Sequence, residues 1–145
     1  IIFGDNEIRS YKGNIYVRQA SKLPSKGWKV LWNGEKKLDI TKKGDSIQFL
    51  RERGKGINLL KLEKEPIIIR FRSGGERIRP DFNRPRRSLK NLFQEKSFPQ
   101  WERDSIPLLF SGEHLVWVPG IGIDYSFQAG ESDLGLIVSW HPNSN

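Results

Sequence analysis

Short apolar segments, each followed within a few residues by a turn, make up most of the chain and limit the folds open to it. These segments lie at residues 14–18, 28–32, 36–40, 46–50, 57–62, 67–72, 107–110, 115–118, 119–123 and 134–140. Short β-branched or alternating segments bounded by Gly, Pro and Asn predict strands. Asn33-Gly34 is a strong turn signal, so 28–32 and 36–40 are predicted to pair as a hairpin. The pattern predicts a β-rich protein.

One segment has the periodicity of a longer helix. Leu89, Leu92 and Phe93 are spaced i, i+3 and i+4, which places them on one helical face. Ser88 is a suitable N-cap, so the helix is predicted from Ser88 to about Lys96. Pro99 opens a second short helical turn over 99–103. The expected fold class is therefore α+β, with one principal amphipathic helix.

Pro66 interrupts the strand pattern and is the best candidate for a boundary. It divides the chain into a β-rich N-terminal part, 1–66, and a second part, 67–145, which we expect to pack together as one compact unit. The chain begins Ile1-Ile2-Phe3 and contains no methionine, so we expect a fragment of a longer protein. No apolar run reaches the roughly 20 residues of a membrane span.

Positive charge is unevenly distributed along the chain. Residues 1–66 carry 15 Lys/Arg and 8 Asp/Glu, residues 67–104 carry 10 and 5, and residues 105–145 carry 0 and 4, so the net charges +7, +5 and −4 sum to +8. A basic region of this kind indicates a nucleic acid or another anionic partner. A soluble protein that is merely basic is the alternative.

The most basic stretch is RPDFNRPRRSLK, residues 79–90, which two prolines predict to be an irregular loop leading into the helix. Arginine forms bidentate contacts with phosphate, and a helix N-terminus adds free N–H groups. The candidate RNA-binding residues are Arg77, Arg79, Arg84, Arg86, Arg87, Lys90 and Arg103. Arg77 has Glu76 or Glu102 as an alternative internal partner. For Arg103 the alternative internal partner is Asp104 or the end of a helix.

Catalytic and metal-binding patterns are not recognisable in the sequence. Cysteine is absent, which excludes thiolate sites and fits a cytoplasmic protein. His114 and His141 lack a second ligand at metal spacing, so structural roles are expected for both. Ser73-Gly74-Gly75 superficially suggests a phosphate-binding loop, but we interpret it as a turn that needs positive φ. Trp101 is expected in the core rather than stacked on a base. No catalytic residue and no metal is predicted.

Several separated blocks together resemble one known family. Residues 71–78, 87–95, 99–110 and 118–123 resemble, in order and spacing, the C-terminal domain of bacterial tRNA(Ile)-lysidine synthetase, and the resemblance covers about 67–142. It implies an α+β unit with a β-sandwich, similar to a domain of the phenylalanyl-tRNA synthetase β-subunit. It also implies that 67–145 is a tRNA-binding module.

The resemblance carries further expectations about function. The family's enzyme uses ATP to attach lysine to the wobble cytidine of a tRNA-isoleucine anticodon, in an N-terminal PP-loop domain with the sequence Ser-Gly-Gly-x-Asp-Ser. Glu76-Arg77-Ile78 follow Ser73-Gly74-Gly75 here, so this chain is expected to dock tRNA without catalysing and to bind no cofactor itself. A structural module that orients the catalytic domain or a second subunit is the alternative, which leaves homodimer formation open.

Overall fold

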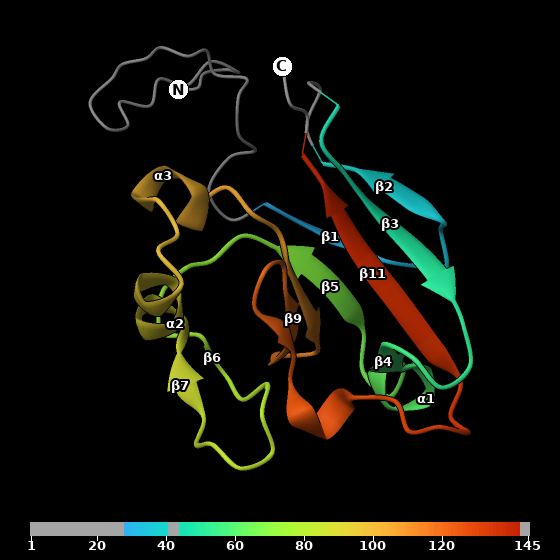
Figure 1. Ribbon diagram of the computed structural model, residues 1–145. Helices are drawn as coiled ribbons and strands as arrows, with labels where there is room; N and C mark the ends of the chain where they lie inside the picture. The colour runs from blue at the N-terminus through green and yellow to red at the C-terminus, as the bar shows by residue number, and fades with distance from the viewer. Residues whose placement is uncertain (1–27, 41–43, 143–145) are drawn as a thin grey trace.

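The computed structural model describes residues 28–40 and 44–142, whose strands form two main antiparallel sheets (Figure 1). The first sheet has the order β1 (Lys29–Leu31), β5 (Ile67–Arg70), β8 (Leu108–Ser111), β9 (His114–Val118) and β10 (Gly122–Ile123). The second has the order β2 (Lys37–Asp39), β3 (Ser46–Arg51), β11 (Gly135–His141) and β4 (Ile57–Asn58). A separate hairpin pairs β6 (Arg77–Ile78) with β7 (Arg87–Ser88).

The two sheets enclose a common apolar core. Ile47 of β3 and Leu136 of β11 belong to the same buried cluster as Ile69 of β5 and Val116 of β9. β3 and β5 contribute alternate residues to this core because successive side chains point to opposite faces. The predicted α+β class with a β-sandwich-like core is confirmed.

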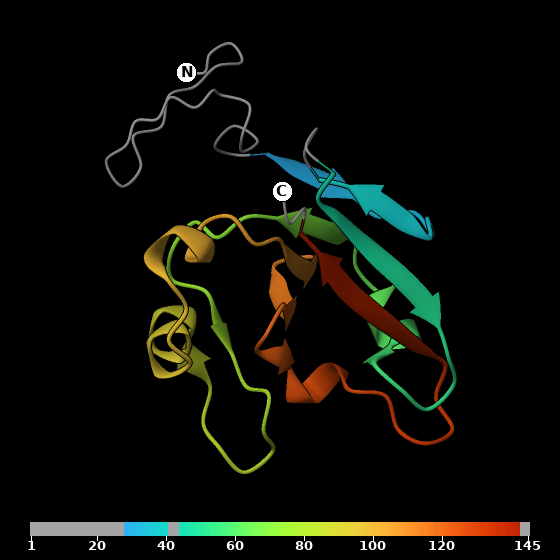
Figure 2. The same ribbon diagram turned by 45° about the horizontal axis from the view of Figure 1, so that its top comes forward.

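A second core lies on the other face of the first sheet. Leu108 and Phe110 pack there with Ile78 of the hairpin and with the helix α2 (Leu89–Glu95), whereas Leu109 between them belongs to the first core. Because β8 is covered on both faces, its sequence is continuously apolar rather than alternating. Figure 2 shows α2 and the hairpin side by side at one end of the molecule.

The principal helix matches its prediction. Ser88 Oγ accepts a hydrogen bond from the backbone N–H of Asn91 at 3.2 Å, and Leu89, Leu92 and Phe93 are buried. The predicted second turn is the short helix α3 (Gln100–Arg103), which follows Pro99. These two helices depend on local capping and spacing, which explains why the sequence was sufficient to find them.

The predicted hairpin around Asn33-Gly34 is wrong. β1 pairs with β5 in the first sheet, while β2 pairs with β3 in the second. The chain changes sheets here because Trp32 is buried between them: its backbone N–H donates to Ile67 O at 2.9 Å, and its ring stacks on Phe49 at 4.9 Å. Burial of a large aromatic side chain outweighs the local turn preference.

The predicted strand over residues 57–62 is also wrong after its first two residues. Asn58 caps the short helix α1 (Leu59–Leu62) by accepting from the N–H of Lys61 at 3.1 Å. Leu59 and Leu62 are buried at helical spacing, and the exposed Leu60 between them concealed that spacing in the sequence. The segment predicted as a strand at 14–18 lies outside the described residues.

Strands from both sides of Pro66 share the two sheets. β1 pairs with β5 across this position, and β11 pairs with both β3 and β4. The assignment of 1–66 and 67–145 to separate parts stays a prediction. In the part of the chain that the structure describes, no helix has the length and apolar character needed to cross a membrane.

Truncating the fully buried Phe93 in the second core should strongly destabilise the protein. We expect Phe93→Ala to lower the free energy of unfolding by about 3–5 kcal/mol, since it removes an aromatic ring and leaves a cavity. Leu60→Ala is the control, because Leu60 is 63% exposed and its loss should change stability by less than about 0.5 kcal/mol. Urea unfolding of both variants measures the difference, and equal effects would contradict the second core.

Candidate nucleic-acid interface

The basic stretch forms a loop, 79–86, between the two strands of the β6–β7 hairpin (Figure 1). Arg77 pairs with Ser88 and Ile78 with Arg87, and the Ile78 side chain is fully buried in the second core. The irregular loop is therefore shorter than predicted, because Arg87 and Ser88 form a strand. Its two ends are held close together by this pairing.

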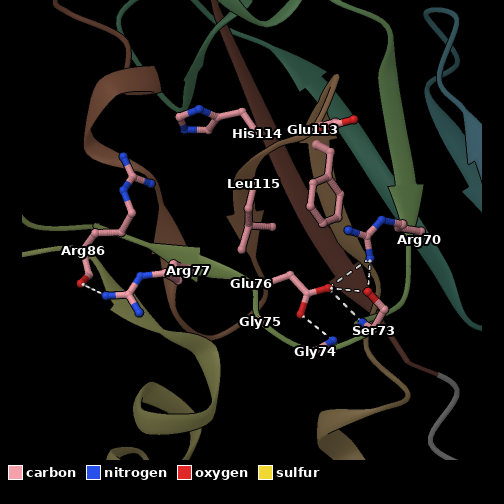
Figure 3. A pocket seen from close by; sticks show the side chains of 11 residues that line it. Arg70, Ser73, Gly74, Gly75, Glu76, Arg77, Arg86, Glu113, His114 and Leu115 are labelled. Carbon is pink, nitrogen blue, oxygen red and sulfur yellow. Dashed lines mark hydrogen bonds and ion pairs between the residues drawn. The ribbon is translucent and has the colours of Figure 1, made fainter.

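The buried carboxylate of Asp124 binds both ends of the loop, at Arg79 and at Arg86. Asp124 is 1% exposed, and its Oδ1 accepts from the backbone N–H of Arg79 at 2.9 Å and lies 3.4 Å from Arg86 Nη1. Its Oδ2 accepts from Ser126 Oγ at 2.6 Å and lies 3.2 Å from His114 Nε2. Figure 3 shows a neighbouring pocket lined by the Ser73-Gly74-Gly75 turn, Arg86 and His114. The Arg86 guanidinium and the His114 ring lie on the same side of it. One carboxylate thus joins the loop, β9 and the start of the 3-10 helix η2 (Tyr125–Phe127).

These contacts keep Asp124 charged. Burial by itself would raise the pKa of Asp124, but the Ser126 hydroxyl, the Arg79 N–H, His114 and the positive charge of Arg86 together lower that pKa below its usual value. The charged form is therefore the one that fits this site at neutral pH.

The Ser73-Gly74-Gly75 turn also holds an internal anion (Figure 3). Glu76 accepts from the N–H groups of Ser73 and Gly74 at 2.8 and 2.9 Å, and it pairs with Arg70 at 3.1 Å. Burial would raise the pKa of Glu76, but these hydrogen bonds lower it. Gly74 and Gly75 have φ values of 114° and 86°, so the predicted positive-φ turn is confirmed. The protein's own carboxylate therefore occupies the N–H groups of Ser73 and Gly74.

Four of the candidate cations make contacts within the protein. Arg77 donates to Arg86 O at 2.9 Å, Arg86 pairs with Asp124, Arg87 pairs with Glu95 at 2.8 Å, and Arg103 Nε donates to Phe98 O at 3.0 Å. Two of the three acids that the sequence suggested as partners are engaged elsewhere, Glu76 with Arg70 and Asp104 with Arg72. Sequence proximity failed here because these acids pair with Arg70 and Arg72, which lie at the end of β5 and just beyond it.

The remaining candidates differ in how accessible they are. The Arg84 side chain is 60% exposed, and its Nε is 4.0 Å from Asp81 Oδ2, a weak surface pair. The Lys90 side chain is exposed on α2 and forms no hydrogen bond or ion pair with the residues that the structure describes. Arg79 is half-buried, with its guanidinium 5.5 Å from the centre of the Tyr125 ring. Arg84 and Lys90 are thus the cations most available to an external anion.

The start of α2 offers fewer N–H groups than the sequence suggested. The N–H of Leu89 donates to Glu76 O at 3.0 Å, and that of Asn91 donates to Ser88 Oγ. The helix has only seven residues, so its dipole is small. The exposed positive charge at this surface therefore comes from side chains rather than from the helix terminus.

Three residues were missed or misplaced by sequence reasoning. Trp101 is 55% exposed on α3, so its predicted place in the core is wrong. Asp124 was missed because it lies in the cation-free segment, although Asp-x-Ser is a recognisable turn pattern. Phe82 lies between the two prolines of the loop and is 69% exposed. Sequence reasoning missed it because the exposure of a loop residue depends on the tertiary structure.

The histidines have ordinary polar partners. His114 contacts Asp124 as described, and His141 Nε2 lies 2.9 Å from Ser139 Oγ. Across residues 28–40 and 44–142, no three of His, Asp and Glu gather in an arrangement that could hold a metal ion.

Comparison with known proteins identifies the family. The family described as "TilS substrate C-terminal domain" matches residues 67–140, which is half of the chain. The chain belongs to this family. The tRNA(Ile)-lysidine synthase of Nitrosomonas europaea is 45% identical over 137 residues, 94% of this chain and 30% of that protein. The tRNA(Ile)-lysidine synthase of Coxiella burnetii is 32% identical over the same shares.

The match also extends to the fold of a solved structure. A crystal structure of a TilS C-terminal domain superimposes with a TM-score of 0.59 at 20% identity, over 72% of this chain and 88% of that one. This likeness concerns the fold. The chain spans 30% of the length of both lysidine synthases. The resemblance read from the separated sequence blocks is therefore confirmed.

Replacing the buried carboxylate should make stability depend less on acid pH. Because the pKa of Asp124 is lowered on folding, its charge adds stability above the usual value of 3.8, and that stability is lost as pH falls through the lower folded pKa. Asp124→Asn should lower the free energy of unfolding by about 1–3 kcal/mol at pH 7. This loss should become smaller as the pH falls below 3.8.

The matched control for this measurement is Asp81→Asn, because the Asp81 side chain is 64% exposed. Its unfolding free energy should stay within about 0.5 kcal/mol of the wild type at every pH. Urea unfolding between pH 3 and 7 measures both variants. A deficit of Asp124→Asn that is the same at all pH values would contradict the role of the charge.

Proposed function

We propose that this chain docks tRNA-isoleucine for a tRNA(Ile)-lysidine synthase, the ATP-dependent enzyme that attaches lysine to the wobble cytidine of the anticodon. Membership of the family supports the enzyme class. The observation that supports docking is the loop 79–86 with α2, which presents exposed cations on a backbone held by Asp124. A surface fixed before binding loses little conformational entropy when its partner arrives.

The shape and charge of this surface suit a double-helical RNA stem. The deep groove of A-form RNA admits few side chains, so recognition relies on phosphates, 2′-hydroxyls and overall shape. Arg84 and Lys90 can contact phosphates. A pocket of about 420 Å³ lies between the loop and α2, and its lining combines the cations Arg84, Arg87 and Lys96 with the acids Asp81 and Glu95.

Catalysis is proposed to lie in the rest of the enzyme. The Ser73-Gly74-Gly75 turn is filled by Glu76, which supports the interpretation that ATP binds elsewhere, in a PP-loop domain. On this proposal ATP and lysine are substrates of the whole enzyme, in the cytoplasm, and this chain contributes affinity for the tRNA body without a catalytic group.

Binding of tRNA should weaken steeply with salt. Each phosphate neutralised by Lys or Arg contributes about −0.7 to −0.9 to the slope of log K against log salt. Fluorescence anisotropy of labelled tRNA-isoleucine, titrated with the chain between low and physiological salt, measures this slope. A chain that binds no tRNA at low salt, and instead shows a concentration-dependent mass, would favour the alternative structural role.

Charge reversal at the two most accessible cations should weaken binding without unfolding the protein. Arg84→Glu/Lys90→Glu is expected to lower tRNA affinity about tenfold or more, since it replaces two phosphate contacts with repulsion. Lys36→Glu/Lys37→Glu is the matched control, with the same change in net charge at exposed positions beside and in β2. Equal losses in the two double variants would exclude the loop as the interface.

A further inference from the structure

Phe82 in the loop and Tyr125 in η2 form an exposed aromatic pair that the docking of phosphates does not use. Phe82 is 69% exposed and Tyr125 is 40% exposed, and their ring centres are 5.1 Å apart. The guanidinium of Arg79 lies 5.5 Å from the centre of the Tyr125 ring, on a half-buried side chain. The Phe82 ring lies against Tyr125 and is largely exposed, so it is placed to contact a ligand rather than to fill the core.

The backbone beneath this pair is held in one position. The N–H of Tyr125 donates to Arg79 O at 2.6 Å, and Gln128 Nε2 donates to Pro80 O at 2.8 Å. Together with the Arg79–Asp124 hydrogen bond, these contacts join the base of the loop to η2. Phe82 is thus presented on a backbone with two prolines nearby, which limits the ordering needed when a ligand binds.

The charges around the pair select the class of ligand. Arg84 lies two residues from Phe82 and is 60% exposed, and Asp81 is the one acid in the loop. Aromatic rings flanked by cations bind single-stranded nucleic acid, because bases stack on the ring while the phosphates meet the charges. A hydrophobic protein partner would gain from Phe82 but would have to desolvate the adjacent guanidinium groups.

We propose that Phe82, supported by Tyr125 and Arg79, is a stacking site for an unpaired RNA base that adjoins a double-helical stem. Arg84 and Lys90 contact the phosphates of the stem, and the unpaired base beyond its end reaches Phe82. This site rests on the proposed function, since it uses the same RNA surface, and it adds recognition of unpaired nucleotides to the recognition of charge.

The experiment compares short RNA hairpins that end blunt with hairpins that carry a few unpaired nucleotides at one end. The wild-type chain should bind the overhanging RNA at least about 5-fold more tightly than the blunt RNA, the lower end of the range expected for stacking of one base. A fluorescent adenine analogue in the overhang should be quenched on binding. Phe82→Ala and Phe82→Leu should abolish both the preference and the quenching, while Phe82→Trp should retain them.

Two controls separate stacking from a structural effect. Leu60→Ala removes an exposed apolar side chain on α1, and it should leave the preference unchanged. The salt dependence of blunt-hairpin binding should be the same for Phe82→Leu and the wild type, because the phosphate contacts remain. Equal loss of affinity for both hairpins in Phe82→Leu would overturn the stacking site.

The outcomes also distinguish this inference from the proposed function. Equal wild-type binding of blunt and overhanging hairpins would overturn the stacking site and leave RNA docking intact. Absence of binding to either hairpin and to tRNA would overturn both. Retention of the preference in Phe82→Leu would show that apolar bulk, and not an aromatic face, makes the contact, and would also overturn the proposal.

Discussion

The buried carboxylate of Asp124 is the interaction on which the candidate interface depends. A charged group this deeply buried is costly unless it is fully hydrogen-bonded, and Asp124 is bonded to Arg79, Arg86, His114 and Ser126. Because these partners come from the loop, β9 and η2, satisfying one charge fixes three segments relative to one another. The arginines that point outward, such as Arg84, gain a defined backbone from this arrangement.

Some arginines of the basic stretch form ion pairs within the protein, while others are exposed to solvent. Arg86 and Arg87 are engaged with Asp124 and Glu95, which reduces their availability but fixes the direction of the loop. Arg84 and Lys90 then carry the exposed charge. The same principle applies at Ser73-Gly74-Gly75, where Glu76 occupies N–H groups that could otherwise attract a phosphate. A basic sequence therefore overstates the number of cations open to RNA.

The sequence was sufficient where local interactions decide the structure. The spacing of Leu89, Leu92 and Phe93 and the cap at Ser88 predicted α2, and the charge distribution located the basic surface. It failed at residues 28–40 and 59–62, where burial of Trp32 and of Leu59 and Leu62 against distant strands outweighed the local turn and strand preferences. Separated blocks of residues identified the family, because their order reflects the whole fold.

The sequence by itself determined the β-rich class, the principal helix and the segment that carries the positive charge, since these follow from periodicity and composition along a few neighbouring residues. The tertiary structure decided which cations are free and which are internal. It also decided that Trp101 and Phe82 are exposed and that Asp124 supports the loop. Each of these depends on contacts between residues far apart in the chain, such as Arg79 with Asp124, and the pairing of distant residues cannot be read from local pattern.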